Sequence, residues 1–283
     1  MKKIIDGKVR DVYEISESEV VIVTTDRVSA FDVILPSPVP NKGKALNKLS
    51  SFWFDYTGDI IENHMISENL NDMPEYFRKD EFKDRTILVK NLKMLPFEFI
   101  IRGYMFGNMW NSYKETSSFC GCKLREGYEL AERLETPILT PSSKSSEGHD
   151  IYITMEDVKK ELGEELTEKI KDVSLKLYER CYNYAYEKGI IIADTKLEFG
   201  IDAKGELVLA DEIFTPDSSR FWDKNEYRTG VSPTSFDKQF LRDWLIANKL
   251  NGVIPAPQIP EDIMKKTAAK YLECQEKIVP AGK

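Results

Sequence analysis

The residues with the clearest chemical potential alternate along one short segment. Asp194, Lys196 and Glu198 stand two residues apart after an isoleucine run, so a β-strand would point all three to one face. Asp211 and Glu212 follow the next apolar run. Carboxylates and a lysine on one face suit Mg²⁺ with a nucleotide polyphosphate, because Mg²⁺ prefers oxygen ligands and lysine is a point cation for phosphate. The alternative is a solvent-exposed, salt-bridged hairpin.

The register of this predicted hairpin decides whether its charged groups meet. The strands are expected over 190–199 and 206–210, with a four-residue turn between them. That turn places Lys196 opposite Asp211, so that Glu198 and Asp211 share a face. A one-residue slip would separate them.

A second polar segment directly follows the acidic end of the hairpin. Ser218, Ser219, Arg220 and Lys224 stand within seven residues and could gather around a phosphomonoester, because arginine offers two parallel donors. The alternative is a proline-initiated turn that carries a surface arginine.

Two further segments place cations beside glycines. Lys8 and Arg10 alternate after Gly7 at a strand entry and could cover phosphates, although this is neither a Walker loop nor a dinucleotide fingerprint. A solvated strand start is the simpler interpretation. Arg102 precedes a glycine-containing turn that joins a predicted strand to a helix, where an anion could bind, or where the turn is only structural.

The elements that must position these residues follow from apolar spacing. The N-terminal part is β-rich, and the segment from Thr154 through Tyr184 is a long helical region, opened by Thr154 with Asp157 three residues on. Residues 127–151 are polar and turn-rich and predict a loop, while 91–96 could be a hinge beside an adenine-type ligand. The remaining elements are strands over 9–15, 19–25, 31–35, 86–90 and 96–101 and helices over 44–56, 233–248 and 260–277.

Composition narrows the class of protein. The 283 residues include 40 Lys and Arg against 48 Asp and Glu, a net charge of −8, which argues against a nucleic-acid or membrane partner. The four cysteines lack C-x-x-C spacing and the two histidines are far apart, so a structural zinc site is not expected. With no signal-like or membrane-spanning run, we expect a cytoplasmic protein.

Taken together, several motifs resemble the SAICAR (phosphoribosylaminoimidazole-succinocarboxamide) synthetase family, in its longer form, over nearly the whole chain. The motifs occur in the order of the family, which is far more specific than any one of them. They are GKVRDVYE (7–14), TDRVSAFD (25–32), IIRGYMFGN (100–108), TPSSKSSEGHD (140–150), ADTKLEFG (193–200) and ADEIFTPDSSRFWD (210–223).

The resemblance implies an α+β fold with two lobes, distantly like protein kinases, with antiparallel sheets and a helical C-terminal extension. We expect a nucleotide-covering lobe over 1–95, a central lobe with the metal and substrate site over 96–232, and the extension over 233–283. The implied reaction joins carboxyaminoimidazole ribotide to L-aspartate with ATP and Mg²⁺, through an acyl phosphate. The enzyme would be a monomer or a homodimer.

The resemblance also implies residue roles. The residues expected at ATP are Lys8, Val9, Arg10, Lys90, Leu92, Met94, Glu198 and Asp211, of which Glu198 and Asp211 would ligate Mg²⁺. The catalytic set is Lys196, Asp194 and Asp217. The substrate-binding set is Arg102, Asn108, Ser219, Arg220, Lys144 and His149. Asn108 departs from the frequent serine of the family, so a hydroxyl contact to phosphate would become an amide contact.

Two other functions compete with this one. A small-molecule kinase on a related two-lobed fold would use the same metal ligands, but it needs a base for the accepting hydroxyl. No H-R-D or D-F-G motif is present, which argues against a protein kinase. A non-catalytic nucleotide-binding protein would be expected to have lost a metal carboxylate or the phosphate arginine, and Glu198, Asp211 and Arg220 are all present.

Overall fold

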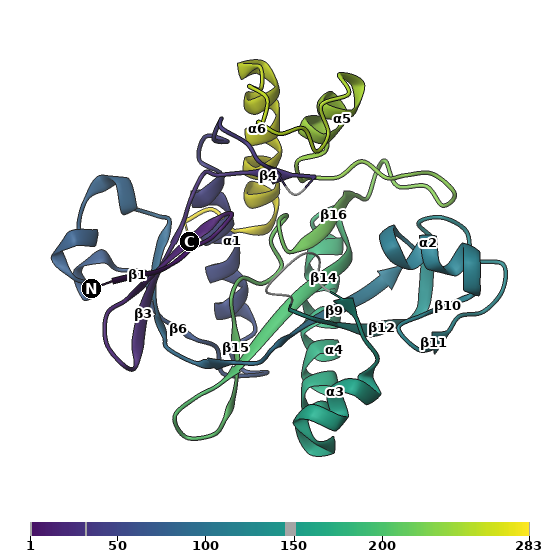
Figure 1. Cartoon of the computed structure of the whole chain (residues 1–283), viewed down its shortest axis with the longest axis horizontal. Helices are drawn as coiled ribbons and strands as arrows, with labels where there is room; N and C mark the ends of the chain where they lie inside the picture. Colours follow the sequence, from purple (N-terminus) through teal and green to yellow (C-terminus); the bar gives the residue numbers. More distant parts are fainter. Residues whose placement is uncertain (1, 32, 145–150, 283) are drawn as a thin grey trace.

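The computed structural model describes residues 2–31, 33–144 and 151–282, and two antiparallel sheets organise the chain (Figure 1). The N-terminal sheet has five strands whose neighbours all run antiparallel. Its central strand is a run of valine and isoleucine that is buried almost throughout, as a β-branched core strand should be. In spatial order the strands are β1 (Lys2–Asp6), β2 (Arg10–Glu14), β3 (Glu19–Thr24), β7 (Thr86–Lys90) and β6 (Met65–Ser67).

The second sheet is built around β14 (Ile190–Ile201), the long strand at the centre of Figure 1. Along its length this strand pairs first with β16 and β9, and then with β15 and β8. The other strands are β13 (Ile151–Tyr152), β12 (Arg133–Ser143), β9 (Phe97–Tyr104), β15 (Leu207–Ala210), β16 (Ser219–Asp223) and β8 (Lys93–Met94).

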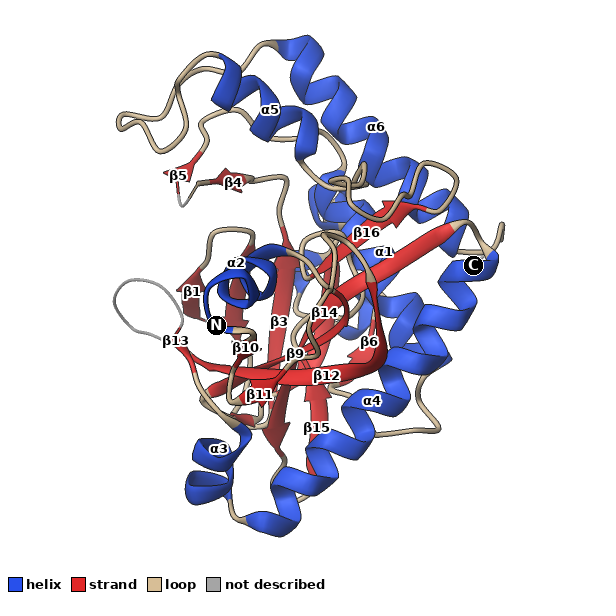
Figure 2. Cartoon of the chain, turned by 90° about the vertical axis from the view of Figure 1, so that its right-hand side faces the viewer, coloured by secondary structure: helices blue, strands red, loops and turns tan. Residues whose placement is uncertain are grey.

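Helices cover the sheets, and Figure 2 shows α4 running along one side of the strands with α5 and α6 together at the top. They are α1 (Lys42–Tyr56), α2 (Gly107–Thr116), α3 (Met155–Leu162), α4 (Glu164–Glu187), α5 (Gln239–Ala247) and α6 (Glu261–Ile278). The short elements are β4 (Ser29–Ala30), β5 (Val33–Ile34), β10 (Ser118–Phe119), β11 (Cys122–Lys123) and the single turns η1 (Leu70–Asp72), η2 (Glu75–Phe77) and η3 (Asp80–Phe82).

The main core lies where α4 packs against the second sheet. Ile170, Val173, Leu177 and Cys181 recur at helical spacing and are all buried, as predicted. They contact a layer that includes the apolar start of β14. This packing holds the strand that carries the charged residues in place.

Truncating this layer should destabilise the fold. We expect Leu177→Ala, at a side chain with no exposed surface, to lower the free energy of unfolding by about 3 kcal/mol, because it leaves a cavity in a packed core. Urea denaturation followed by tryptophan fluorescence measures this loss. Glu179→Ala, an exposed position on the same helix, should change it by less than about 0.5 kcal/mol, and equal effects would contradict the assigned helix face.

Several sequence-based predictions need correction. Within the predicted loop over 127–151, residues 133–143 form the strand β12, whose proline-containing segment is stabilised by its pairing with β9. The proline-initiated turn, given as the alternative for this segment, is present over 216–218, but Ser219 and Arg220 already belong to strand β16, paired with β14. The long helical region is divided at Gly163, whose φ of 83° ends α3, and α5 begins later than predicted, at Gln239. β1 was not predicted, and of the predicted strand over 31–35 only Val33–Ile34 forms a strand, β5, which pairs with β4.

The predicted helix over 44–56, the strands over 19–25 and 86–90, and the final helix are confirmed within two residues at each end. The division of the chain after residues 95 and 232 stays a prediction. Within the described residues, no helix combines the length and the apolar character needed to cross a membrane.

Candidate active site

The β14–β15 hairpin brings Lys196 and Asp211 together, although its register differs from the predicted one. Glu198 pairs with Ala210, so the one-residue slip that we expected to separate the charges does occur. The turn is tighter than predicted, because the Asp202 carboxylate accepts hydrogen bonds from the backbone amides of Lys204 and Glu206 and the Asp202 amide donates to the Glu206 carbonyl at 3.0 Å.

Asp211 nevertheless stays close to Lys196 despite this slip. Asp211 is the first residue beyond the last paired position, and its φ of 63° is left-handed. The chain therefore leaves the strand, and the carboxylate turns back so that its Oδ2 lies 3.1 Å from Lys196 Nζ.

Lys196 is the centre of a cluster of carboxylates. Its Nζ lies 3.2 Å from Glu98 Oε1 and 3.1 Å from Asp211 Oδ2 and also pairs with Glu198. Burial alone would lower the pKa of Lys196, but Asp211, Glu198 and Glu98 raise it well above its ordinary value. The lysine is therefore a permanent cation at physiological pH.

The two carboxylates of the predicted metal site have opposite pKa shifts. Burial, and then the charge of Asp211, raise the pKa of Glu198. Burial would also raise the pKa of Asp211, but Arg10 and Lys196 outweigh it and hold that pKa well below its usual range. Arg10 pairs with both Asp211 and Glu212, and Lys144 pairs with Glu198.

The carboxylates of Glu198 and Asp211 fit a divalent cation that takes its remaining ligands from phosphate and water. Glu198 and Asp211 contact the same Nζ atom, so their oxygens lie close together and repel one another. Within the described ranges, no group of three or more His, Cys, Asp or Glu side chains is arranged to hold a metal ion. Two carboxylates with phosphate and water oxygens are what Mg²⁺ usually takes beside a nucleotide.

A cavity of about 470 Å³, here called the hairpin cavity, lies between the β1–β2 turn and this cluster. Val9, Val12 and Ile22 supply apolar walls, while its cations outnumber its carboxylates by four to three. Such a lining suits a ligand with a flat apolar part and several negative charges. The charged residues are Lys8, Arg10, Lys196, Lys238, Asp211, Glu212 and Asp217.

A second cavity of about 260 Å³, the arginine cavity, lies on the other side of Lys196. Asp194 accepts a hydrogen bond from Arg102 Nη1 at 3.3 Å and pairs with Arg220. Arg102 is almost fully buried and its Nε donates to Thr140 Oγ1 at 3.0 Å. Two arginines that share a single buried carboxylate keep donors available for an anion.

The two cavities share part of their lining. Lys196, Asp217 and Lys238 line both. A ligand in either cavity would therefore meet the same lysine, and groups at the adjoining ends of two ligands would lie close together.

Of the other residues predicted to bind substrate, only some line the arginine cavity. Ser219 lines the arginine cavity and donates its hydroxyl hydrogen to Thr195 Oγ1 at 2.8 Å. Asn108, at the start of α2, is not among the described residues that line this cavity. Its amide donates to the Tyr152 hydroxyl at 2.9 Å. His149 lies outside the described residues.

The predicted adenine segment is not a simple hinge. Lys93 and Met94 form β8, which pairs with Ile201 and Gly200 of β14, and Lys90 pairs with Glu62. None of the predicted residues Lys90, Leu92 and Met94 is among the described side chains that line the hairpin cavity.

Sequence reasoning missed several polar residues at the site, among them Glu98, Lys238, Lys42 and Tyr271. Glu98 could have been found, because it lies on the same face of its strand as Arg102, four residues on. Lys238, Lys42 and Tyr271 had no such signal, because tertiary packing alone brings Lys238 to the cavities and the other two to Asp217. Lys42 and Tyr271 contact Asp217 from behind.

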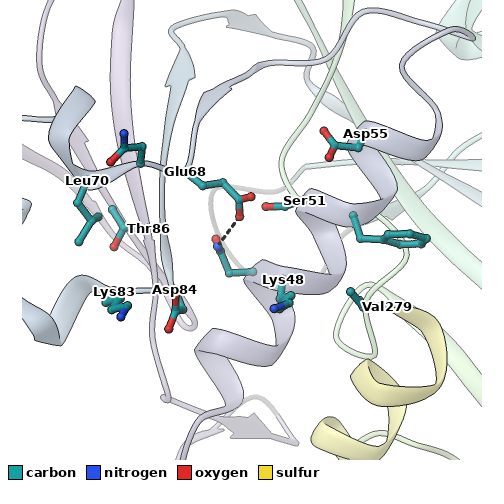
Figure 3. Close-up of a pocket in the computed structure, with 12 residues that line it drawn as sticks. Lys48, Ser51, Asp55, Glu68, Leu70, Lys83, Asp84, Thr86 and Val279 are labelled. Carbon is teal, nitrogen blue, oxygen red and sulfur yellow. Dashed lines mark hydrogen bonds between the residues drawn. The ribbon is translucent and has the colours of Figure 1, made fainter. Parts of the chain in front are cut away.

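A third cavity, of about 480 Å³, lies beside α1 and is drawn in Figure 3. Ser51 and Glu68 point into the same space there (Figure 3). None of the predicted site residues is among its described lining, and its two lysines, Lys48 and Lys83, face three carboxylates. Its lining therefore attracts a polyanion less strongly than the lining of the hairpin cavity does.

Comparison with known proteins identifies the family. The SAICAR synthetase family model matches residues 3–257. The phosphoribosylaminoimidazole-succinocarboxamide synthase of Maridesulfovibrio salexigens is 50% identical over 276 residues, which are 96% of this chain and 92% of that protein. The enzyme of the same name from Thermodesulfovibrio yellowstonii is 50% identical over 94% of this chain and 91% of its own length.

Solved structures of SAICAR synthetases have the same fold as this chain. SAICAR synthase from Saccharomyces cerevisiae, solved in complex with SAICAR, superposes with a TM-score of 0.91 at 42% identity and covers 98% of this chain and 94% of its own. A type-2 SAICAR synthetase in complex with ADP has a TM-score of 0.67 at 25% identity, covering 90% of this chain and 99% of its own. The α+β fold is thus confirmed, and the chain belongs to the SAICAR synthetase family of carbon–nitrogen ligases.

Proposed function

We propose that the chain joins 5-amino-1-(5-phosphoribosyl)imidazole-4-carboxylate, the carboxyaminoimidazole ribotide, to L-aspartate with consumption of ATP, in purine biosynthesis. The observation that carries this proposal is the shared lining of the two cavities at Lys196. A nucleotide phosphate on one side and a substrate carboxylate on the other would meet at one fixed cation, which is the arrangement that phosphoryl transfer between them needs.

The hairpin cavity would hold ATP. Lys8 and Arg10 line it beside the β1–β2 turn and would contact the phosphates, with the Val9 side chain as an apolar wall. Glu198 and Asp211 would hold Mg²⁺, which neutralises phosphate charge when bound. The ADP complex of the type-2 relative supports a nucleotide in this fold. The segment with Lys90, Leu92 and Met94 stays our proposal for the adenine side.

The arginine cavity would hold the ribotide. Arg102 and Arg220 would bind its phosphate, with Ser219 and the Asn108 amide nearby. Asp194 would keep both arginines in place, and Asp217 would accept a hydrogen bond from the substrate amino group. Lys144, paired with Glu198 in this structure, and His149 are assigned to the edge of the substrate site.

The chemistry follows from the weak reactivity of a carboxylate. Its oxygen would attack the γ-phosphorus of ATP, forming an acyl phosphate as the bond to ADP breaks. The aspartate amine would then attack the acyl carbon, forming the C–N bond, losing a proton and releasing phosphate. Lys196 would stabilise the negative charge shared by phosphate and carboxylate in the first step.

ADP release by the purified protein tests this proposal, with ribotide and L-aspartate added singly and together. We expect full turnover, with the succinocarboxamide detected by mass, only with both substrates and Mg²⁺. Turnover with an accepting hydroxyl compound and neither substrate would support the kinase alternative. ATP binding without any turnover would support the non-catalytic one.

Gly107 supplies a second test of the ribotide site. Its φ is +60°, and an added Cβ would lie 2.8 Å from Arg220 Nη2. We expect Gly107→Ala to raise the KM for ribotide about tenfold and to destabilise the fold by about 1 kcal/mol. Gly127→Ala is the matched control, because its φ is +81° and nothing lies within 4 Å of the added Cβ. A similar KM in both variants would contradict the role of Arg220.

A further inference from the structure

A buried triad joins three elements behind the shared wall of the two cavities. Lys42 Nζ lies 2.6 Å from Asp217 Oδ2, and the Tyr271 hydroxyl donates to Asp217 Oδ1 at 2.6 Å. The side chains of Lys42 and Asp217 are 0% and 6% exposed, and Tyr271 is 0% exposed. Each oxygen of the carboxylate is therefore held by its own partner.

The partners come from distant parts of the fold. Lys42 is the first residue of α1, and its Nζ also donates to the backbone carbonyl of Arg27 at 3.2 Å. Tyr271 lies in the middle of α6, and Lys42 Nζ lies 5.6 Å from the centre of its ring. The triad thus connects the first and last long helices of the chain to the segment between β15 and β16.

Burying a charged pair in this way costs desolvation free energy, so the triad is not explained by stability alone. Burial lowers the pKa of Lys42, and Asp217 only partly opposes it. Burial would raise the pKa of Asp217, yet Lys42 and Lys238 hold it well below its usual range. Apolar side chains of similar volume would often stabilise the fold as well or better. What the triad adds is a carboxylate with a fixed orientation.

The fixed orientation matters because of where Asp217 points. The same residue lines both cavities, and each carboxylate oxygen has a second lone pair, so acceptor capacity remains beside the contacts with Lys42 and Tyr271. An ionised carboxylate accepts hydrogen bonds but donates none, so it selects an amino group as its ligand.

We propose that Lys42 and Tyr271 are positioning residues that orient Asp217 toward the amino group of the bound ribotide. This inference rests on the proposed function. It predicts that loss of either partner weakens ribotide recognition and leaves the binding of ATP largely unchanged, because Asp217, although it lines both cavities, can accept a hydrogen bond from the ribotide amino group but has no donor for the nucleotide phosphates.

Tyr271→Phe is the decisive variant, because it removes the hydroxyl and keeps the ring. We expect the KM and the calorimetric Kd for ribotide to rise about tenfold, with the KM for ATP changed less than twofold. Tyr184→Phe is the matched control, because the Tyr184 hydroxyl donates to the carbonyl of Ile278, also in α6, at 3.0 Å. It removes a contact of the same helix without touching Asp217.

Lys42→Met provides a second measurement if it folds. It should raise the KM and the Kd for ribotide more than Tyr271→Phe does, again with little change in the KM for ATP. Equal effects of Tyr271→Phe and Tyr184→Phe, or a parallel rise of the ATP and ribotide constants, would overturn the inference and leave Tyr271 a structural residue. Absence of ligase turnover in the unmodified enzyme would instead overturn the proposed function. Ribotide calorimetry still tests the triad in that case.

Discussion

Glu198→Gln is expected to reduce turnover about 1,000-fold at saturating ATP, ribotide and aspartate. The substitution keeps the shape of the side chain and removes one of the two charged oxygen donors proposed for Mg²⁺. Asp211, the other donor, is already engaged by Arg10 and Lys196, so it cannot replace the lost charge. The measurement is coupled ADP release over a range of Mg²⁺ concentrations.

The folded state should tolerate this change. Burial raises the pKa of Glu198, which shows that the ionised form is held at a cost, and the neutral amide avoids that cost. Glu206→Gln is the control on the same hairpin, because Glu206 is exposed and pairs only loosely, at 3.6 Å, with Lys169. Activity of Glu198→Gln that matches this control at saturating Mg²⁺ would remove Glu198 from the metal site.

Arg220→Ala is expected to raise the KM for ribotide about 10- to 100-fold, since hydrogen bonds to charged groups contribute about 1.5–3 kcal/mol. The proposed contact is to a phosphate that does not react, so kcat should change much less than KM. Loss of the guanidinium also leaves Asp194 with Arg102 as its only remaining arginine partner among the described residues.

Steady-state kinetics with each substrate varied in turn distinguishes the ligands. Arg180→Ala makes the same chemical change at a surface pair with Asp59 and should leave every constant within about twofold. An increase confined to the KM for ATP would mean that Arg220 belongs to the nucleotide and not to the ribotide.

Strong local patterns made part of the fold predictable. The valine and isoleucine run of β3 and the helical stripe of α4 are apolar enough to determine their own conformation. β12 was missed because Pro137, Pro141 and its polar residues conceal a strand that forms only when β9 lies beside it. β16 was missed for the same reason, since its partner is β14.

The candidate site was predictable to the extent that its residues share one strand. The alternation of Asp194, Lys196 and Glu198 is independent of hairpin register, so the cluster was found even though the predicted register was wrong. The backbone turn at Asp211 depends on a single left-handed residue, which no pattern indicates. Lys42 and Tyr271 reach Asp217 only through tertiary packing, and their positions in the chain carry no sign of it.

The central position of β14 has a consequence for the order of folding. The N-terminal sheet uses strands between residues 2 and 90, so all of its strands are available early in synthesis. β14 must pair with β9, whose Arg102 lies 92 residues before its partner Asp194, and Arg10 must reach Asp211, 201 residues on. Closing such long loops costs entropy before any contact repays it. Formation of the charge cluster should therefore be the slow, late step of refolding, and nucleotide-binding competence should lag behind the recovery of secondary structure.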